Sequence, residues 1–366
     1  MKEKYTCLLS IIILFLFSHI SIAQCNDVSL NNLTNPGPYE VATLTEEDGI
    51  RNGPDYLEAT IYYPINATKS LPSIAIVPGW GADPSSIEEW GPFFASHGIV
   101  SIIISTNSLY LDFTEERASA LLDALETIKQ ENIRELSPLK GNLNLDKLAV
   151  SGWSMGGGGA QRAAVHDNTI SAVVALCPYL GDFLLDHQSP VLIFSGENDP
   201  TAPPSEHADI QYSNTPNTTD KLLVEIENGD HSVANTPNGA NGEIGKIALS
   251  WLKLYLEDNN CYCPLLKDNL LTNSSVTSKI EQNFDCESLG ITNEEFTIGY
   301  YPNPTKNSVN FTVNKDIQYQ LYSSLGQRIL TGQLSENNNQ IDLSRFSTGI
   351  YYLSIKNKII KLIKTD

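Results

Sequence analysis

The pentapeptide Gly152-Trp-Ser-Met-Gly156 is a G-x-S-x-G pattern, and three more glycines follow it at 157–159. An apolar run typical of a strand, Lys147–Ser151, precedes the pattern, and a stretch able to form a helix follows it to about Val165. A strand, a sharp turn and a helix in this order make a nucleophile elbow, which lifts a serine hydroxyl above the end of a sheet. We therefore predict that Ser154 is an enzymatic nucleophile rather than part of a glycine-rich turn.

A nucleophilic serine requires an imidazole base and a carboxylate that orients the imidazole. In doubly wound hydrolases the three residues follow in chain order serine, acid, histidine, each in a loop after a strand. Asp199 follows the strand candidate Val191–Ser195, and His231 follows the next candidate, Leu222–Glu227. We predict that Asp199 is the acid and that His231 is the base.

Other side chains compete for these two roles. Asp230 and Glu197 are near alternatives for the acid. His207 follows Asp199 in the chain but lies in what reads as the start of a helix. The remaining histidines all precede Asp199, namely His19, His97, His166 and His187.

An ester transition state also needs two backbone amides that bind the developing oxyanion. One is expected from Met155, directly after the nucleophile, and the second from Trp80 in the glycine-containing loop Pro78–Ala82. Trp80, Trp153 and Tyr179 would add aromatic surface beside the serine. Such surface predicts a substrate with flat or apolar acyl groups, although each ring is also compatible with ordinary core packing.

Strands and helices alternate between about residue 56 and residue 260. The strand candidates are Glu58–Tyr63, Ser73–Val77, Val100–Ser105, Leu148–Ser151, Ala172–Leu176, Val191–Ser195 and Leu222–Glu227. The helix candidates include Ser86–Ser96, Glu115–Leu136 and Gly242–Glu257. Strands rich in Val and Ile with few charges are typical of a parallel sheet covered on both faces, so we predict a doubly wound α/β fold.

Four regions are expected along the chain. Residues 1–23 combine a basic start, an apolar core and Ser-Ile-Ala, which predicts a secretory signal peptide cleaved before Gln24; lipidation of Cys25 is the alternative. Residues 24–264 form the catalytic domain, and residues 265–297 read as an irregular tail and linker. Residues 298–366 show short strands between Asn and Gly turns, such as Asn310–Val313, Ile317–Tyr322 and Ile350–Ile355, and predict a small β-sandwich-like domain.

Charge and cysteine content limit the partners. Residues 24–297 hold 13 Lys and Arg against 38 Asp and Glu, a net charge of −25, which disfavours nucleic acid and anionic membranes. Export permits disulfides, and we expect Cys261 or Cys263 to pair with Cys286, leaving the other for Cys25, while Cys177 is a buried thiol. We expect no metal and no cofactor, since neither metal-ligand spacing nor a nucleotide fingerprint occurs. We also expect a monomer.

The motifs together resemble the cutinase-like polyester hydrolases, which include bacterial poly(ethylene terephthalate) hydrolases, in the dienelactone-hydrolase-like branch of α/β-hydrolases. The resemblance covers roughly residues 36–260 and rests on Ile76–Ala82, Glu89–Gly98, Thr106–Ser108, Gly152–Gly159 and Glu197–Asp199. It implies an α/β-hydrolase fold, a shallow cleft without a lid, a Ser154–Asp199–His231 triad, and an oxyanion hole from the amides of Trp80 and Met155.

Some residues depart from that family. It commonly carries Tyr or Phe at the position of Trp80 and Trp at the position of Tyr179, so the aromatic clamp differs. His207 falls where many members carry a His near the clamp. These departures imply that activity on an aromatic polymer is altered or modest.

The tail resembles the type IX secretion C-terminal sorting domain through Tyr301–Thr305, Gly349–Leu353 and the basic segment Lys356–Lys364. This resemblance implies export across an outer membrane by the secretion machinery; an accessory β-module is the alternative. We expect a secreted serine esterase that cleaves polyesters, including aromatic ones, through an acyl-enzyme. The alternatives are an esterase for small or carbohydrate esters and a non-catalytic surface-binding protein.

Overall fold

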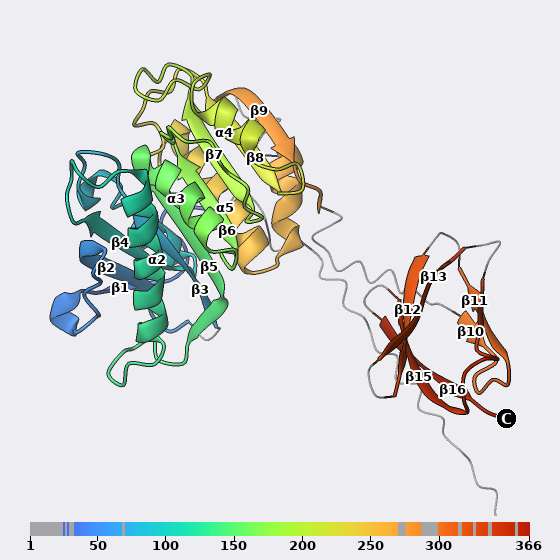
Figure 1. Ribbon diagram of the computed structural model, residues 1–366. Coiled ribbons are helices and arrows are strands. Elements are labelled where there is room, and N and C mark those ends of the chain that lie inside the picture. The colour runs from blue at the N-terminus through green and yellow to red at the C-terminus, as the bar shows by residue number, and fades with distance from the viewer. Residues whose placement is uncertain are drawn as a thin grey trace, which may run out of the picture. The chain divides into compact units, whose positions relative to one another are not determined.

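The computed structural model describes residues 25, 28, 33–67, 70–269, 276–286, 299–313, 317–324, 327–335, 339–355 and 358–366. The chain divides into two compact units, residues 1–290 and 291–366 (Figure 1). The signal peptide expected at residues 1–23 lies outside the described residues. Among those described, no helix has the length and hydropathy needed to cross a membrane.

A nine-stranded sheet organises the first unit, in the order β1-β2-β4-β3-β5-β6-β7-β8-β9 (Figure 1). From β4 to β8 in this order all neighbours pair in parallel, whereas β1–β2, β2–β4 and β8–β9 are antiparallel pairs. The strands are β1 Val41–Leu44, β2 Tyr56–Pro64, β3 Leu71–Val77, β4 Val100–Thr106, β5 Leu143–Trp153, β6 Ala172–Leu176, β7 Val191–Gly196, β8 Lys221–Ile226 and β9 Thr277–Asn283. The predicted doubly wound α/β fold is confirmed.

Helices cover both faces of this sheet. One core contains residues of α1 (Trp90–Ser96) and α5 (Glu243–Leu256), and the other contains residues of α2 (Thr114–Glu131), α3 (Met155–His166) and α4 (Ala208–Asn214). Successive residues of the central strands alternate between the two cores, as Ile74 and Ile76 do against Ala75 and Val77. Because side chains of a strand point alternately to opposite faces, a run without polar residues is what a sheet buried on both sides requires.

The prediction of an irregular tail at 265–297 is wrong at Thr277–Asn283, which form β9 on the edge of the sheet. β1 was also not expected. Neither strand is rich in buried apolar residues: β9 reads Thr-Ser-Lys-Ile-Glu-Gln-Asn and is half-buried to exposed throughout. An edge strand with one solvated face and polar residues carries little of the signal by which buried strands are identified.

Two disulfides lie near the end of the first unit. Cys263 pairs with Cys286, which follows β9, and Cys25 pairs with Cys261. This resolves the two pairings that the sequence left open. Cys177 is a free, buried thiol, as predicted, and burial raises its pKa far above the ordinary value.

Every regular element in the described part of the second unit is a strand, as predicted. Two sheets, β10-β11-β14 and β13-β12-β15-β16, enclose one core that includes Phe311, Leu321 and Leu353. Its strands are β10 Gly299–Tyr301, β11 Ser308–Thr312, β12 Ile317–Ser323, β13 Arg328–Leu334, β14 Gln340–Asp342, β15 Gly349–Ile355 and β16 Lys358–Lys364.

Candidate active site

Ser154 lies at a sharp turn between β5 and α3. Its backbone has φ 56° and ψ −122°, outside the regions that side chains with a Cβ favour. Such a conformation costs on the order of 1–3 kcal/mol and persists only where the surroundings enforce it. Here the amide of Ser154 donates to the Leu176 carbonyl at 2.9 Å, and the Ser154 carbonyl accepts from the amide of Tyr179 at 2.8 Å. The end of β6 therefore holds the strained turn in place.

The glycines around Ser154 permit close approach of backbone to backbone. A Cβ on Gly156 would lie 2.4 Å from the Val77 carbonyl oxygen, and one on Gly158 would lie 2.3 Å from the Tyr179 carbonyl oxygen. Any larger residue would push the first turn of α3 away from the strand ends. This requirement explains why residues that disfavour a helix by about 1 kcal/mol each begin this one.

Three side chains form a continuous hydrogen-bonded relay. The Ser154 Oγ lies 2.8 Å from His231 Nε2, and His231 Nδ1 lies 2.6 Å from Asp199 Oδ2. Ser154 and Asp199 are buried, with 7% and 4% of their surface exposed, and the His231 side chain is 15% exposed. With the proton on Nδ1 donated to Asp199, Nε2 is free to accept the serine proton.

Asp199 is held as a carboxylate. Its Oδ1 accepts from the amides of Thr201 and Ala202, both at 2.8 Å, while Oδ2 accepts from His231. Burial alone would raise the pKa of Asp199, but the hydrogen bonds from His231 and the two amides outweigh burial and lower it below its usual value. The site therefore keeps a fixed negative charge against the imidazole.

The other carboxylates considered for the acid are engaged elsewhere. Asp230 Oδ1 accepts from the amide and hydroxyl of Ser232, and Glu197 Oε2 accepts from the amide of Asn228. His207 contacts the backbone of Leu180 through Nδ1. Of the sequence-predicted candidates, the structure brings together Ser154, Asp199 and His231.

The loops that carry Asp199 and His231 follow the neighbouring parallel strands β7 and β8, so both loops start at the carboxyl ends of these strands, on the same side of the sheet. The amide of Asn198 donates to the Gly229 carbonyl at 2.8 Å, which joins the two loops directly. A Cβ on Gly196 would lie 2.5 Å from the Asp230 carbonyl oxygen, so the two loops can approach this closely only because residue 196 is glycine.

The two expected oxyanion amides flank the serine. A Cβ on Gly79 would lie 2.9 Å from the Ser154 Cβ, which places the Pro78–Ala82 loop directly against the nucleophile. Within the described part of the chain, the amides of Trp80 and Met155 donate no hydrogen bond, so both are available to an oxygen outside the protein. Met155 is also the first residue of α3, where helix amides favour negative charge.

Sequence reasoning missed Arg117, a fully buried residue of α2. Its guanidinium donates to the carbonyl oxygens of Pro78 at 3.0 Å and Gly79 at 2.8 Å, and it lies 3.8 Å from the Met155 sulfur. Burial lowers its pKa to about 10. The available signal was an arginine beside the mostly apolar face of α2 that includes Ala118, Leu121 and Leu125.

The three expected aromatic residues differ in exposure. Trp80 is 52% exposed, Tyr179 is 36% exposed, and Trp153 is half-buried. The Trp153 indole N–H donates to the His231 carbonyl at 2.8 Å, and its ring lies 5.1 Å from the imidazole, so Trp153 also supports the histidine. Tyr179 packs on His207 with ring centroids 4.4 Å apart.

Comparison with known proteins decides the family. Residues 27–286 match the family described as PET hydrolase-like. The chain belongs to this family. A bis(hydroxyethyl) terephthalate hydrolase of Streptomyces coelicolor is 34% identical over 240 residues, 64% of this chain and 74% of that protein.

Other relatives of this PET hydrolase-like chain are named as a cutinase and a lipase. Cutinase est1 of Thermobifida alba is 35% identical over 242 residues, which cover 64% of this chain and 78% of the cutinase. Lipase 1 of a Moraxella species is 31% identical over 254 residues, 68% of this chain and 76% of the lipase. The resemblance to cutinase-like hydrolases, and with it the expectation of a serine-type carboxylic ester hydrolase, is confirmed.

Residues 299–365 match the secretion system C-terminal sorting domain. This match covers the second unit almost completely. It confirms the expected sorting domain and the expectation that this PET hydrolase-like protein is secreted or displayed at the cell surface.

Proposed function

We propose that this protein is a secreted serine esterase that cleaves polyesters, including aromatic polyesters such as poly(ethylene terephthalate), through an acyl-enzyme. The observation that carries the proposal is the relay from Ser154 Oγ through His231 to Asp199 at 2.8 and 2.6 Å. Two amides beside the serine, which donate no hydrogen bond to any described residue, and membership of the PET hydrolase-like family support it. A non-catalytic surface-binding role gives no reason for these features.

In the acylation step, Ser154 Oγ attacks the ester carbonyl carbon while His231 Nε2 takes the serine proton. The carbonyl oxygen becomes an oxyanion, and the amides of Trp80 and Met155 donate to it. Asp199 stabilises the imidazolium through its hydrogen bond to Nδ1. The tetrahedral intermediate then collapses, the C–O bond to the alcohol breaks, and His231 returns the proton to the leaving alkoxide.

Deacylation repeats these steps with water. His231 Nε2 removes a proton from water as the oxygen attacks the acyl carbon, and the same two amides stabilise the second oxyanion. Release of the acid restores the Ser154 hydroxyl.

Arg117 positions the amide of Trp80. In a trans peptide the C=O and N–H groups point in opposite directions. The Gly79 carbonyl points to the Arg117 guanidinium at 2.8 Å, so the N–H of Trp80 in the same peptide points away from Arg117. A second bond, to the Pro78 carbonyl, fixes the preceding peptide. Arg117 thus acts as a positioning residue of the oxyanion hole.

The relatives supply the substrate class. Their names refer to bis(hydroxyethyl) terephthalate, cutin and lipids, and exposed Trp80 and Tyr179 offer ring surface for a flat acyl group. We place Trp80, Trp153 and Tyr179 in the acyl-binding surface and expect the enzyme to act as a monomer. The second candidate is an esterase for small soluble esters, and the similarity to a protein named bis(hydroxyethyl) terephthalate hydrolase supports this candidate.

The test compares three substrates with one preparation of the enzyme. Soluble products released from amorphous poly(ethylene terephthalate) film are measured by chromatography beside hydrolysis of tributyrin and of an acetylated xylose. The proposal expects aromatic products from the film, and these must vanish in the Ser154→Ala variant. Hydrolysis of soluble esters with no product from film would replace the polyester proposal by the second candidate.

A further inference from the structure

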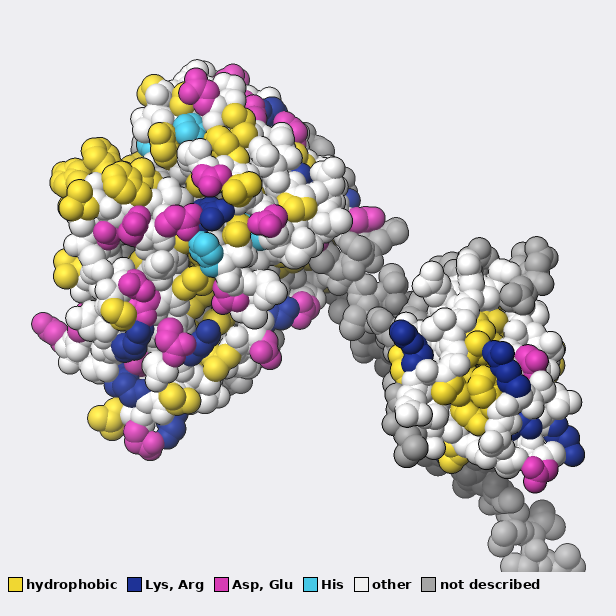
Figure 2. Space-filling model, viewed as in Figure 1, with side chains coloured by type: hydrophobic (Ala, Val, Ile, Leu, Met, Phe, Trp, Pro, Cys, Tyr) yellow, Lys and Arg dark blue, Asp and Glu magenta, His cyan; other side chains and the backbone are white. Residues whose placement is uncertain are grey.

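A group of exposed hydrophobic side chains lies between β4 and α2. Tyr110, Leu111 and Phe113 are 58%, 72% and 53% exposed, and Trp80 beside them is 52% exposed. Figure 2 shows hydrophobic side chains gathered at the edge of the first unit, near the N-terminal end of α2. Single exposed hydrophobic residues are ordinary, but a contiguous group of large ones indicates a binding surface. We name Trp80, Tyr110, Leu111 and Phe113 the hydrophobic rim.

The loop that carries the rim is well ordered by its own hydrogen bonds. The amide of Ser108 donates to the Asp112 carboxylate at 3.0 Å, and the amide of Asp112 donates to the Ser108 carbonyl at 3.3 Å. At the end of the loop the amide of Phe113 donates to Glu116 at 2.9 Å. The exposure of the rim is therefore a property of a fixed backbone, not of a frayed segment.

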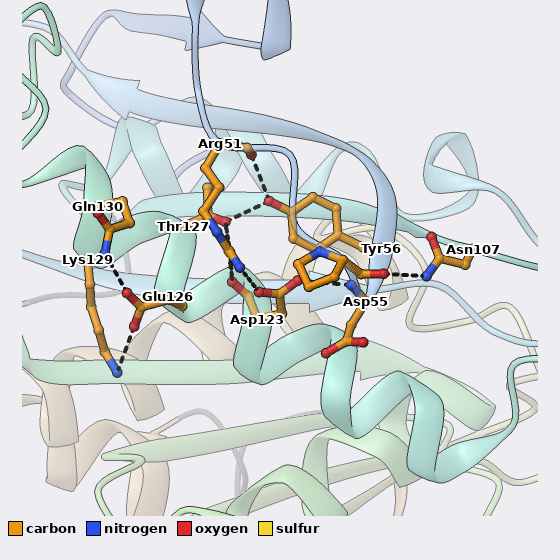
Figure 3. A network of polar contacts seen from close by, with 10 residues as sticks. Arg51, Asp55, Tyr56, Asn107, Asp123, Glu126, Thr127, Lys129 and Gln130 are labelled. Atoms are coloured by element: carbon orange, nitrogen blue, oxygen red, sulfur yellow. Dashed lines mark hydrogen bonds and ion pairs between the residues drawn. The ribbon is translucent and has the colours of Figure 1, made fainter.

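A second network ties the start of this loop to the body of the unit (Figure 3). The Asn107 side chain donates to the Pro54 carbonyl at 2.9 Å, and the amide of the next residue, Asp55, donates to Asp123 of α2 at 3.0 Å. Arg51 bonds the same Asp123 carboxylate at 2.5 Å. Rigid presentation lowers the entropy lost when a flat ligand binds.

The rim is continuous with the active site. The Trp80 indole N–H donates to the Tyr110 carbonyl at 3.0 Å, and the two rings meet edge to face with centroids 5.3 Å apart. The amide of Gly81 donates to the Leu109 carbonyl at 2.8 Å. Trp80 follows Gly79, which lies against Ser154. Apolar surface thus extends outward from the residue assigned to the oxyanion hole.

The negative charge of the first unit limits which ligands the hydrophobic rim can bind. Residues 24–297 carry a net charge of −25, and Asp112, Glu115 and Glu116 lie in or next to the rim segment. An anionic lipid surface would be repelled by this charge, whereas an uncharged chain would not be. The rim combines the aromatic side chains of Trp80, Tyr110 and Phe113 with the aliphatic side chain of Leu111. This combination suits a polymer chain of alternating flat and aliphatic segments.

We propose that the hydrophobic rim is an extended subsite that binds the uncharged chain of a polyester beyond the ester held at Ser154. This inference deepens the proposed function and rests on it. The scissile ester lies at the serine, and the neighbouring repeat units lie over Trp80 toward Tyr110, Leu111 and Phe113. A small ester that ends before Tyr110 gains nothing from Tyr110, Leu111 and Phe113.

The test uses Leu111→Ser/Phe113→Ser, with Ile133→Ser/Leu136→Ser as the matched control. Ile133 and Leu136 are 64% and 86% exposed and follow the opposite end of α2, so the control removes the same number of exposed hydrophobic side chains. We expect the rim variant to release at least about fivefold less product from polyester film. We also expect kcat/KM on p-nitrophenyl acetate to stay within about twofold of the parent. Equal losses on film and acetate, or no loss on film, would overturn the inference.

A second readout separates this inference from the proposed function. Adsorption to polyester film is measured in the Ser154→Ala background, where no hydrolysis interferes. The rim substitutions should weaken adsorption at least about fivefold, and the control substitutions should not. If the rim variant adsorbs as the parent does, the inference is overturned, whether or not the parent cleaves film. Rim-dependent binding to anionic phospholipid vesicles with no binding to film would also overturn it, and would assign the rim to lipid.

Discussion

At the residue scale, the proposed chemistry depends on one strained serine and on the groups that fix its surroundings. The chain order serine, acid, histidine predicted Ser154, Asp199 and His231, because each follows a strand with a clear apolar pattern, and the structure brings these three side chains within hydrogen-bond distance. Arg117 was missed because no sequence motif distinguishes it from the other charged residues of α2, some of which, such as Asp123 and Glu131, are also buried. The positioning role proposed for Arg117 rests on the hydrogen bonds from its guanidinium to the Pro78 and Gly79 carbonyls.

Substitution of Arg117 by Met should lower kcat on p-nitrophenyl butyrate by roughly tenfold to a hundredfold, with little change in KM. The loss is smaller than the 10²–10³ expected for removal of an oxyanion donor itself, because Arg117 acts through the peptide of Gly79 and Trp80. Affinity for a boronic acid inhibitor, whose tetrahedral oxygen occupies the oxyanion hole, should fall in parallel. Arg117→Lys should recover part of both losses.

Arg162→Met is the control for this experiment. It removes another largely buried arginine, on α3, together with its bond to Glu115. It should leave kcat and boronate affinity unchanged. An Arg117→Met enzyme that loses thermal stability but keeps both kcat and boronate affinity would assign Arg117 a structural role only.

At the element scale, the central strands of the sheet position the loops of the proposed active site, and the edge strands complete the unit. The central strands were predictable because each buries both faces. β9 was not, because its alternation is weak and its place follows from pairing with β8 and from the Cys263–Cys286 disulfide. The boundary expected at residue 264 therefore fell short of the unit, which extends to about residue 290.

The Cys263–Cys286 disulfide closes a loop of 23 residues. Replacing both cysteines by Ser should lower the free energy of unfolding by about 3 kcal/mol, since the crosslink restricts the unfolded chain. For Cys25→Ser/Cys261→Ser the separation is 236 residues, and the loss should be larger, about 5 kcal/mol. Denaturant unfolding of the two double variants measures both. Losses below about 1 kcal/mol in each would contradict a stabilising role.

Buried histidines make the unit sensitive to acid. Burial lowers the pKa of His97, whose ring bonds the Thr34 carbonyl, to about 4, and burial lowers the pKa of His187 to about 4. Between pH 6.5 and pH 4 the unfolded chain binds protons that the folded chain does not, so stability falls as the pH falls. Each histidine contributes on the order of 2–3 kcal/mol to this loss.

The measurement is Tm as a function of pH in the parent and in His97→Gln. The variant loses a packed ring and should be less stable than the parent at pH 7. Because it no longer titrates at this position, the gap should shrink at pH 4.5. Two parallel curves from pH 7 to pH 4.5 would rule out the contribution of His97.

At the scale of the whole molecule, an acidic catalytic unit is joined to a small β unit that matches a sorting domain. The separate cores of the two units indicate that each folds around its own apolar residues. The composition change near residue 298 made this division predictable. The small β unit has no residue in the proposed mechanism.

A chain ending at Gly290 should keep the kcat/KM of the full-length protein on p-nitrophenyl butyrate and should fail to leave the cell. A chain ending at Pro264, which lacks β9 and Cys286, should be clearly less stable, because the edge of β8 is then uncovered. Activity assays and thermal melts of the two purified proteins, with fractionation of the expressing cells, check these outcomes. Full activity loss on truncation at Gly290 would give the small β unit a catalytic role.

The most direct test of the account is the turnover of p-nitrophenyl butyrate by Ser154→Ala, with Ser232→Ala as the matched control beside His231. The account predicts that kcat/KM falls by about 10⁴ or more in Ser154→Ala, since removal of one triad member abolishes the shared mechanism. It predicts no change beyond about twofold in Ser232→Ala, whose hydroxyl bonds Asp230. A folded Ser154→Ala protein with turnover within about tenfold of the parent would contradict it.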